Sequence, residues 1–567
     1  MSDQTHISLN AVELCYLSLE KQCTERGITV SRLKGAADGY LGVRLQGALR
    51  QWDLHANCEE ENLSLPDLYL AEPRGLHPHV SYHGWVCVND GQGLSIDRDR
   101  PADIAAYTIL AGFDLLEKWS IDSRAEHIEF FNELEGYWLG LPGSGVGRAG
   151  FDVNSQNRPV MVYVNEKAKS EKWFFIERGA TAPREFNLDK AQPHRALYIH
   201  LDQIPLPPSY PNKLEHTYIE SLCSLFSAEQ TDLWNHLLAP SKSKPKNVVL
   251  LVSVPRQAGG CSLVGMAFRT HHGKIDLRAP VVPLTIKRHT PSYMRERGGA
   301  SLDLLGKHVG VLGCGAIGAV VADTLAAAGV GRLTLIDNDD YSEENVFRHI
   351  LEPLYIGIKK VIGLKFKLER QYPGLQVNAV PATAQTWLQA AQFDGFDGIL
   401  LAFGAPSIER SFSRALRREK HQLPLVFTWL EALDLGGHSV LLWSNKEGCL
   451  DCLYRDDEGQ PSLLPRTAFL EANQPVTRNL TGCGSTFMPY SALQSRRTGL
   501  MAAEQMLGAI AGKLSEPAYS FWTGEGTVAQ EQGLQPTNWW HEAKRTTQQQ
   551  GTARVFGRPC KRCREMR

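Results

Sequence analysis

The feature that most constrains the fold is a glycine-rich turn between an apolar strand and an apolar helix. Gly313, Gly315 and Gly318 form a G-x-G-x-x-G motif between a predicted strand at 308–312 and a predicted helix at 316–329. A strand at 332–336 follows, and this order is typical of a parallel, doubly wound sheet. The glycines let a phosphate approach the backbone N–H groups at the helix N-terminus. The motif alone does not exclude a nicotinamide site, because dehydrogenases also carry it.

Polar residues downstream of the turn favour a triphosphate. The strand at 332–336 ends in Asp337-Asn338-Asp339, and an acid at that strand end can bind ribose hydroxyls. Asn345, Arg348 and Lys360 follow closely, and cationic side chains behind a glycine loop suit a triphosphate whose charge must be stabilised. Any one of them could be a plain surface charge. As a set, they predict a nucleotide triphosphate site.

At this point residues 305–515 resemble the ThiF-type adenylating domain shared by ubiquitin-activating enzymes and the bacterial molybdopterin and thiamine sulfur-carrier activators. The resemblance is carried by the glycine loop, AGVGRLTLIDND, N-x-x-R and I-G-x-x-K. It implies a Rossmann-like domain over 291–567 that uses ATP and Mg²⁺. It also implies that Asp337 contacts ribose, that the Asn, Arg and Lys contact phosphates, and that the chain is a homodimer. In the family the partner supplies an arginine, for which Arg295 or Arg297 is the candidate here.

One position departs from that family. The family places an Mg²⁺-binding Asp after its next strand, where ILLAFGAPSIER puts Gly404. Asp339 is then the candidate metal ligand. The same departure would also fit a chain that has lost activity.

The cysteines predict a metal centre. The N-terminus shows no signal-peptide pattern, no apolar run reaches the length of a membrane span, and the formal charge of −2 gives no support to a nucleic-acid or membrane partner. We therefore expect a cytoplasmic chain whose 12 cysteines stay reduced. Two C-x-x-C pairs can supply four thiolates to one structural Zn²⁺, as in relatives of the same family; the alternative is a disordered or redox-active tail pair. The four ligands are Cys449, Cys452, Cys560 and Cys563.

Cys483 is the predicted first acyl carrier. It lies between glycines in RNLTGCGSTFMPYSALQ, ahead of a predicted helix at 493–511. In the resembled family a cysteine near this position accepts the activated carboxyl group, and an exposed thiol on a glycine-flanked loop suits that chemistry. The alternative is a small buried residue in a tight turn.

Cys87 is the predicted second carrier. The stretch HPHVSYHGWVC resembles the active-site segment of ubiquitin-conjugating enzymes, where His-Pro-Asn precedes the catalytic cysteine by the same spacing. The resemblance implies an α+β conjugating-like domain over 1–145. His79 replaces the family's Asn, and its imidazole N–H could donate a similar hydrogen bond to the oxyanion. Three histidines that bind a metal, or a plain buried cysteine, are the alternatives.

Residues 146–290 carry no motif and are predicted to form a mixed α/β linker domain with one helix near 213–238. The whole order resembles the fused bacterial conjugation proteins of CBASS antiphage operons. That resemblance implies that the C-terminus of a CD-NTase is activated and joined to an amine on a target. Two other functions stay open, a sulfur-carrier activator that would not use Cys87 and a non-catalytic scaffold.

Overall fold

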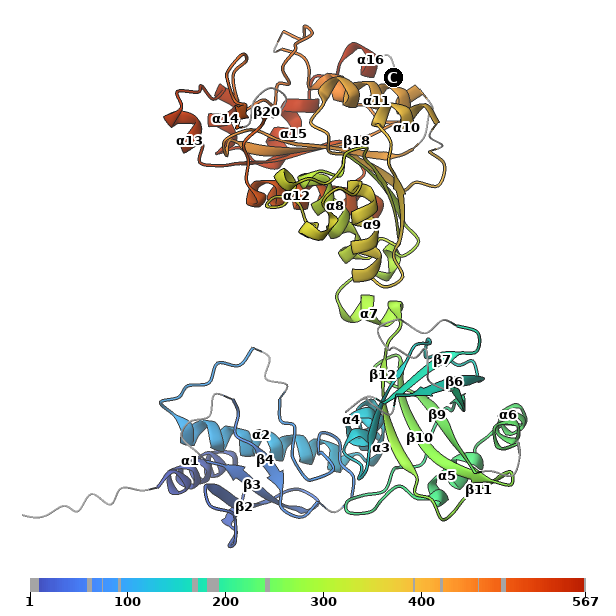
Figure 1. Ribbon diagram of the computed structural model, residues 1–567. Helices are drawn as coiled ribbons and strands as arrows, with labels where there is room; N and C mark the ends of the chain where they lie inside the picture. The colour runs from blue at the N-terminus through green and yellow to red at the C-terminus, as the bar shows by residue number, and fades with distance from the viewer. Residues whose placement is uncertain are drawn as a thin grey trace, which may run out of the picture. The chain divides into compact units, whose positions relative to one another are not determined.

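The computed structural model contains two compact units, residues 1–290 and residues 291–567 (Figure 1). It describes residues 10–58, 64–73, 75–89, 93–165, 172–180, 193–239, 245–390, 393–418, 422–456, 458–480 and 486–564. Across these ranges, no helix combines the length and the apolarity that a bilayer span requires.

The first unit begins with helix α1, which is followed by a four-stranded antiparallel sheet in the order β1-β2-β3-β4. Asn10 caps the preceding helix through the Glu13 amide, and Gly27 ends it with a φ of 68°. Helices α1 and α2 pack against the apolar face of the sheet, where Leu41, Leu54 and Ile109 are fully buried. The bounds are α1 Ala11–Arg26, β1 Val30–Arg32, β2 Tyr40–Gln46, β3 Gln51–Asn57, β4 Leu68–Leu70 and α2 Pro101–Ile121.

The rest of the first unit is a closed barrel. Its strands run in the order β10-β12-β5-β7-β6-β8-β9, and β9 pairs back onto β10. Alternate residues face opposite sides: Tyr198 and Leu251 pack inside, whereas Leu197 and Leu250 pack against helices outside. The strands are β5 Gly145–Ala149, β6 Arg158–Val164, β7 Trp173–Glu177, β8 Pro193–His200, β9 Lys246–Pro255, β10 Cys261–His271, β11 Lys274–Ile275 and β12 Val282–Arg288.

The helices that cover the barrel correct one prediction. The single helix predicted at 213–238 is two helices, because Ser227 forms a capping box with Gln230 and starts a new helix. Ahead of the barrel, Glu135 in α4 accepts the Leu263 amide and pairs with Arg288, which ties α4 to the strands. The helix bounds are α3 Ser123–Asn132, α4 Leu134–Leu139, α5 His216–Cys223 and α6 Ala228–Leu238.

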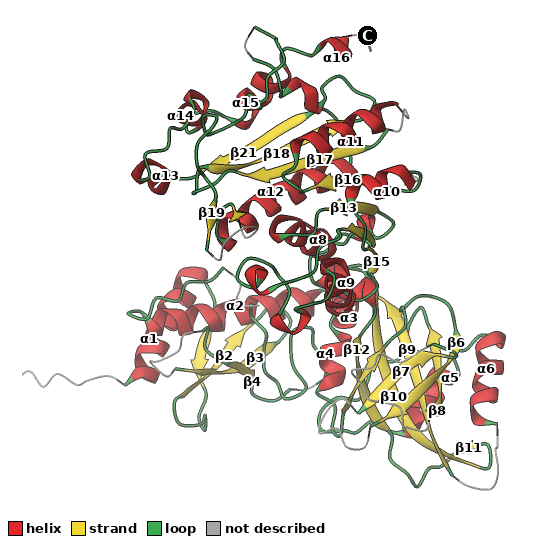
Figure 2. Ribbon diagram, turned by 45° about the horizontal axis from the view of Figure 1, so that its top comes forward, coloured by secondary structure: helices red, strands yellow, loops and turns green. Residues whose placement is uncertain are grey.

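The second unit is built on a seven-stranded sheet in the order β15-β14-β13-β16-β17-β18-β21 (Figure 2). The first five strands are parallel and the last two pairings are antiparallel. Their bounds are β13 His308–Leu312, β14 Arg332–Ile336, β15 Gln376–Val380, β16 Gly398–Leu401, β17 Pro424–Leu430, β18 Gly436–Trp443 and β21 Ala518–Thr523. The predicted strands at 308–312, 332–336, 376–381 and 397–402 are confirmed to within a residue.

Helices cover both faces of this sheet. One face packs α8 Ala316–Ala328, α9 Lys360–Gln371 and α12 Ala492–Ile510, and the other packs α10 Ala384–Ala390, α11 Pro406–Arg418, α14 Asn538–Ala543 and α15 Gln548–Phe556. The order of the parallel strands reverses between β13 and β16, and ligands of such sheets bind at the carboxyl ends of the strands at this point. The smaller elements are α7 Pro291–Arg297, η2 Leu302–Leu304, η3 Glu343–Asn345, η4 Pro353–Tyr355, η5 Leu450–Cys452, β19 Arg478–Asn479, β20 Thr486–Phe487, α13 Thr527–Glu531 and α16 Lys561–Arg564.

Candidate functional site

The glycine turn lies at the switch point of the second sheet. Gly313 directly follows β13 and has a φ of 85°, a conformation that favours glycine. A Cβ on Gly313 would lie 2.8 Å from the Ala402 carbonyl oxygen, and one on Gly318 would lie 1.8 Å from the Gly313 carbonyl oxygen. A Cβ on Gly315 would meet nothing within 4 Å. Two glycines therefore allow the turn to close, and the third leaves open space at the N-terminus of α8.

Asp337 holds the turn from the end of β14. Its Oδ2 accepts the Cys314 amide at 2.6 Å, and its Oδ1 accepts the Asp339 amide at 2.7 Å. Burial raises the pKa of Asp337 above its ordinary value, and the two amides oppose that rise by stabilising the carboxylate. The carboxylate is thus next to the predicted phosphate cradle, while its contact with ribose stays a prediction.

The predicted phosphate ligands lie on the segment after β14. The Lys360 ammonium is 2.8 Å from Asp339 Oδ2; Lys360 is buried, whereas the Asp339 side chain is 71% exposed. Asn345 starts the turn that presents Arg348, because its side chain accepts hydrogen bonds from Ser342 and its carbonyl accepts the Arg348 amide. The Asp339–Lys360 pair and the exposed Asp339 oxygens fit an Mg²⁺–triphosphate, for which Asp339 is the candidate metal ligand.

His349, a residue that sequence reasoning missed, is buried behind the glycine turn and bonds to its backbone. It is 6% exposed, its Nε2 donates to the Cys314 carbonyl at 2.9 Å, and its Nδ1 accepts the Leu351 amide at 3.1 Å. Burial lowers the pKa of His349 to about 4, so the imidazole is neutral. Its place directly after the N-x-x-R motif was the available signal.

A second missed residue lies shortly after Gly404, the position where the resembled family has its Mg²⁺-binding Asp. Gly404 has a φ of 64° and open space around it, so no carboxylate stands at this point. Glu409, on the first turn of α11, is 3% exposed, and its Oε1 has no hydrogen-bond partner in the part of the chain that the structure describes. Burial raises the pKa of Glu409 to about 7. Glu409, the acid nearest in sequence to Gly404, is therefore buried in the protein interior.

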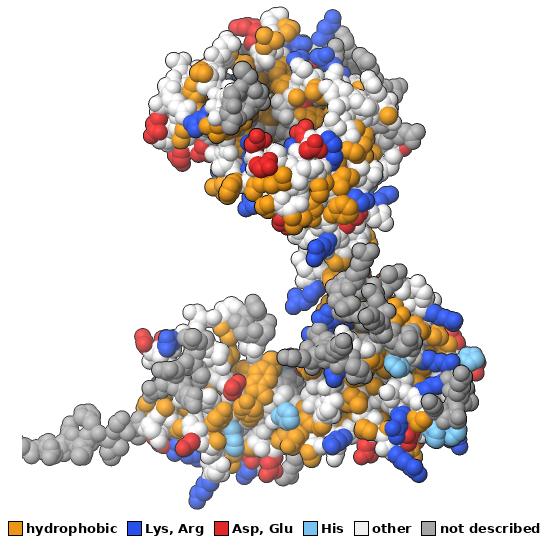
Figure 3. Space-filling view, viewed as in Figure 1, with side chains coloured by type: hydrophobic (Ala, Val, Ile, Leu, Met, Phe, Trp, Pro, Cys, Tyr) orange, Lys and Arg blue, Asp and Glu red, His pale blue; other side chains and the backbone are white. Residues whose placement is uncertain are grey.

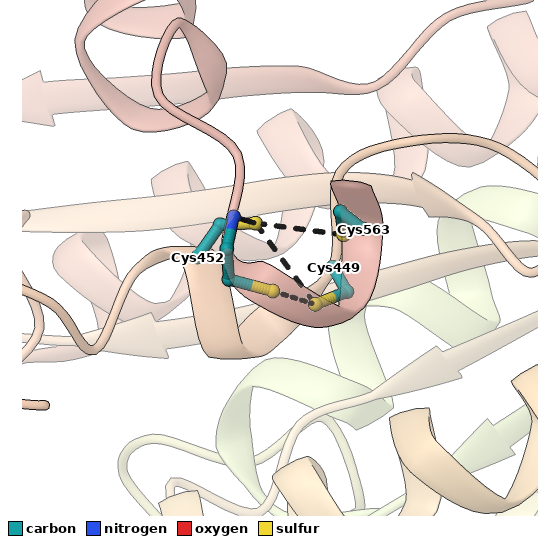
Figure 4. Close-up of side chains that lie close together, drawn as sticks. Cys449, Cys452 and Cys563 are labelled. Atoms are coloured by element: carbon teal, nitrogen blue, oxygen red, sulfur yellow. Dashed lines mark hydrogen bonds between the residues drawn. The ribbon is translucent and has the colours of Figure 1, made fainter. Parts of the chain in front are cut away.

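The two C-x-x-C pairs meet in one buried cluster (Figure 4). The Sγ–Sγ distances are 3.9 Å for Cys449–Cys452, 3.6 Å for Cys449–Cys560 and 3.7 Å for Cys452–Cys563. Four thiolates at about 2.3 Å from a tetrahedral Zn²⁺ are about 3.8 Å apart, and a disulfide needs about 2.05 Å. The cluster therefore fits a tetrahedral metal ion. Arg410 and Arg414 hold Asp451, which lies between the first two ligands.

The two predicted carriers are placed differently. Cys87 lies half-buried at the end of a tight hairpin in the first unit, and its amide donates to the His79 carbonyl at 2.7 Å. Cys483 lies outside the described residues. The strands on either side of it, β19 and β20, pair in antiparallel fashion, and farther along Tyr490 packs under the Arg348 guanidinium at 4.9 Å.

The candidate arginines for a partner's site also differ. The Arg295 guanidinium is buried and donates to the Gly329 carbonyl at the end of α8. Arg297 is exposed at the end of α7. Arg295 thus serves its own unit, which leaves Arg297 as the arginine accessible to a second copy.

A glycine turn at the switch point of a largely parallel sheet places the second unit in the class of doubly wound α/β domains. The chain matches the ThiF family over residues 291–553. It is 26% identical over 239 residues to the ATP-dependent ubiquitin transferase-like protein Cap2 of Pseudomonas aeruginosa (strain BWHPSA011 / Pa011), covering 41% of this chain and 41% of that protein. The chain thus spans about two fifths of the length of the curated Cap2 relatives that it matches.

Two further proteins are similar to parts of this chain. The molybdopterin-synthase adenylyltransferase of Haemophilus influenzae is 30% identical over 117 residues, which is 20% of this chain and 47% of that protein. The crystal structure of E. coli MccB with ATP aligns with 18% identity and a TM-score of 0.29 over 39% of this chain and 61% of that one.

Proposed function

We propose that this protein uses ATP to activate the C-terminal carboxylate of a partner protein and relays the acyl group through Cys483 and Cys87 to an amine. The observation that carries the proposal is the convergence of the glycine turn, Asp337 and the Asp339–Lys360 pair at the switch point. The similarity to Cap2 proteins supports the same class of reaction.

The first step would take place at the glycine turn. The open backbone at Gly315 and the N-terminus of α8 receive the phosphates, and Lys360 and Arg348 stabilise their charge. Mg²⁺, when held by Asp339, would neutralise phosphate charge. A carboxylate oxygen of the partner attacks the α-phosphorus, the bond to the β-phosphate oxygen breaks, and pyrophosphate leaves. The product is an acyl-adenylate.

Thiols would carry the acyl group onward. The Cys483 thiolate attacks the acyl carbon and AMP leaves; the Cys87 thiolate then displaces Cys483 to give a second thioester. An amine attacks that thioester, loses its proton and releases the Cys87 thiolate. The packing of Tyr490 on Arg348 supports the role of Cys483, because it anchors the following segment beside a predicted phosphate ligand. By the CBASS resemblance, the acyl partner would be a CD-NTase and the amine a lysine of a target.

We also propose that two copies associate through the second unit. Phe347, Leu354 and Leu493 are 95%, 73% and 77% exposed. Figure 3 shows hydrophobic side chains gathered on the part of this unit that carries α8, α9 and α12. An exposed apolar surface of this kind marks an interface, and Arg297 is available to a second copy. Phe347→Asp is expected to shift the mass measured by light scattering from dimer to monomer.

The relay is tested by trapping reducible adducts between the purified protein, ATP and a candidate partner. Cys483→Ala should abolish both thioesters, and Cys87→Ala should abolish only the second. The similarity to a molybdopterin-synthase adenylyltransferase favours one rival, the activation of a sulfur carrier. In that case Cys87→Ala would leave all products unchanged. If no ATP-dependent adduct forms at all, the non-catalytic scaffold becomes the better description.

A further inference from the structure

A clamp of two carboxylates holds His79, the residue opposite Cys87 in its hairpin. Glu133 Oε2 accepts the His79 amide at 2.8 Å, and Glu133 Oε1 is 2.9 Å from the ring Nδ1. Glu129 Oε1 is 3.4 Å from the ring Nε2. One carboxylate therefore fixes both the main chain and the side chain of His79, and a second faces the other ring nitrogen. We call these three residues the His79 clamp.

The backbone of His79 needs such support. Its φ is 59°, in the left-handed region that residues other than glycine adopt only when their surroundings hold them there. The bond from its amide to Glu133 supplies one restraint, and the contact of its ring with Glu133 supplies another. The ring also lies at a centroid distance of 6.3 Å from Trp119, inclined by 28°.

The clamp acts on the backbone that carries the predicted nucleophile. The His79 carbonyl accepts the Cys87 amide at 2.7 Å, and the next residues inward, Val80 and Val86, pair as an antiparallel bridge. The position of Cys87 therefore follows the position of the His79 peptide. Glu133 itself lies at the junction of α3 and α4, and α4 packs on barrel strands β10 and β12. The clamp thus ties the hairpin to helices that the barrel anchors.

We propose that Glu133 is a positioning residue for the acyl transfers of Cys87 and acts through His79, an inference that rests on the proposed function. Both ring nitrogens of His79 face carboxylates. The ring therefore holds the hairpin in place. The resemblance to conjugating enzymes implies a different role, in which the ring donates a hydrogen bond to the oxyanion.

The charges of the pair agree with this geometry. The hydrogen bond to Glu133 raises the pKa of His79 above its ordinary value. Burial alone would raise the pKa of Glu133, but the hydrogen bonds from His79 hold that pKa below its ordinary value. Both shifts favour the charged form of the pair, an imidazolium beside a carboxylate.

The test compares Glu133→Gln with Glu126→Gln in the full-length protein. Glu126 is the matched control, because it pairs with His77 at 2.8 Å on the same helix, and the His77 carbonyl accepts Val80 and not Cys87. The rates to measure are amine-driven discharge of the Cys87 thioester and alkylation of the Cys87 thiol by iodoacetamide. We expect Glu133→Gln to slow discharge about tenfold or more, because small misplacements of reacting groups have effects of this size. It should also change the alkylation rate, and Glu126→Gln should change neither.

A double variant separates positioning from a direct role of His79. In Glu133→Gln the remaining side-chain oxygen can still accept the amide of residue 79, so this variant tests the contact with the His79 ring. If Glu133 acts through that ring, the variant with His79→Asn and Glu133→Gln discharges no more slowly than His79→Asn alone. The proposal would be overturned if the rate losses of His79→Asn and Glu133→Gln multiplied in the double variant. Equal discharge rates for Glu133→Gln and Glu126→Gln would also overturn it. Should Glu133→Gln fold poorly, Glu133→Asp takes its place, and the NMR titration midpoint of His79 must then move if the clamp exists. Alkylation and the titration need no partner, so they still test the clamp if no thioester forms and the proposed function fails.

Discussion

Replacement by alanine should have different effects at two glycines of the turn. Gly318→Ala should lower stability, whereas Gly315→Ala should lower the affinity for nucleotide. In Gly318→Ala the new methyl would stand 1.8 Å from the Gly313 carbonyl oxygen, well inside van der Waals contact, and the obstacle is backbone. Relief requires the turn and α8 to separate, an overpacking cost of about 1–3 kcal/mol. For a unit of this size each kcal/mol lowers the melting temperature by about 2–4 °C.

In Gly315→Ala the methyl would meet nothing within 4 Å, and the φ of −74° suits alanine. Stability should change by less than about 1 kcal/mol, because the loss of a favoured N-cap residue is offset by a stiffer unfolded chain. The methyl would nevertheless occupy the space where the phosphates approach the amides of α8. Calorimetric titration with a non-hydrolysable ATP analogue should show at least a tenfold loss of affinity for Gly315→Ala, with its melting temperature retained. A Gly315→Ala protein that binds the analogue like the parent protein would refute the assignment of this turn as the phosphate cradle.

Three further outcomes follow from buried groups. Cys560→Ser should lower the zinc content measured by mass spectrometry from one ion per chain to a small fraction and destabilise the second unit, since metal binding contributes to folding; unchanged content would contradict the cluster. The His349 pKa of about 4 lies below the ordinary 6.5, so stability should be full above pH 6.5 and fall by about 3 kcal/mol toward pH 4; denaturant melts should show this slope flattened in His349→Gln. The Glu409 pKa of about 7 lies above the ordinary 4.5, so ionisation of Glu409 lowers the stability of the folded protein as the pH rises from 4.5 to 7. Glu409→Gln should raise stability at pH 8 by up to about 3 kcal/mol and leave it unchanged near pH 4.

Sequence patterns predicted the second unit more fully than the first. Its parallel strands are buried on both faces and read as continuous apolar runs such as Val309–Leu312, which fix their bounds closely. The barrel was not predicted, because its closure depends on β9 pairing with both β8 and β10, and strand partners leave no local signal. The break between α5 and α6 was missed although its cause, the capping box of Ser227, is local.

The candidate site divides in the same way. The glycines, Asp337 and the four cysteines are recognisable from spacing, because a tight turn and a tetrahedral ion impose it. His349 and Glu409 are not, since a buried His or Glu differs from an exposed one only through the fold around it. Lys360 was predicted as a phosphate ligand, but its pairing with Asp339 became visible only in three dimensions.

The most direct test of the proposed activity is the exchange of radiolabelled pyrophosphate into ATP in the presence of a peptide that ends in a free carboxylate. The matched control is the same peptide with an amidated C-terminus, because only the free acid can attack the α-phosphorus. Peptides with the C-terminal sequence of a CD-NTase are the first to test. We predict exchange with the free acid, none with the amide, and little or none in Gly315→Ala. Equal exchange with both peptides, or binding of a nicotinamide dinucleotide in place of ATP, would contradict the account.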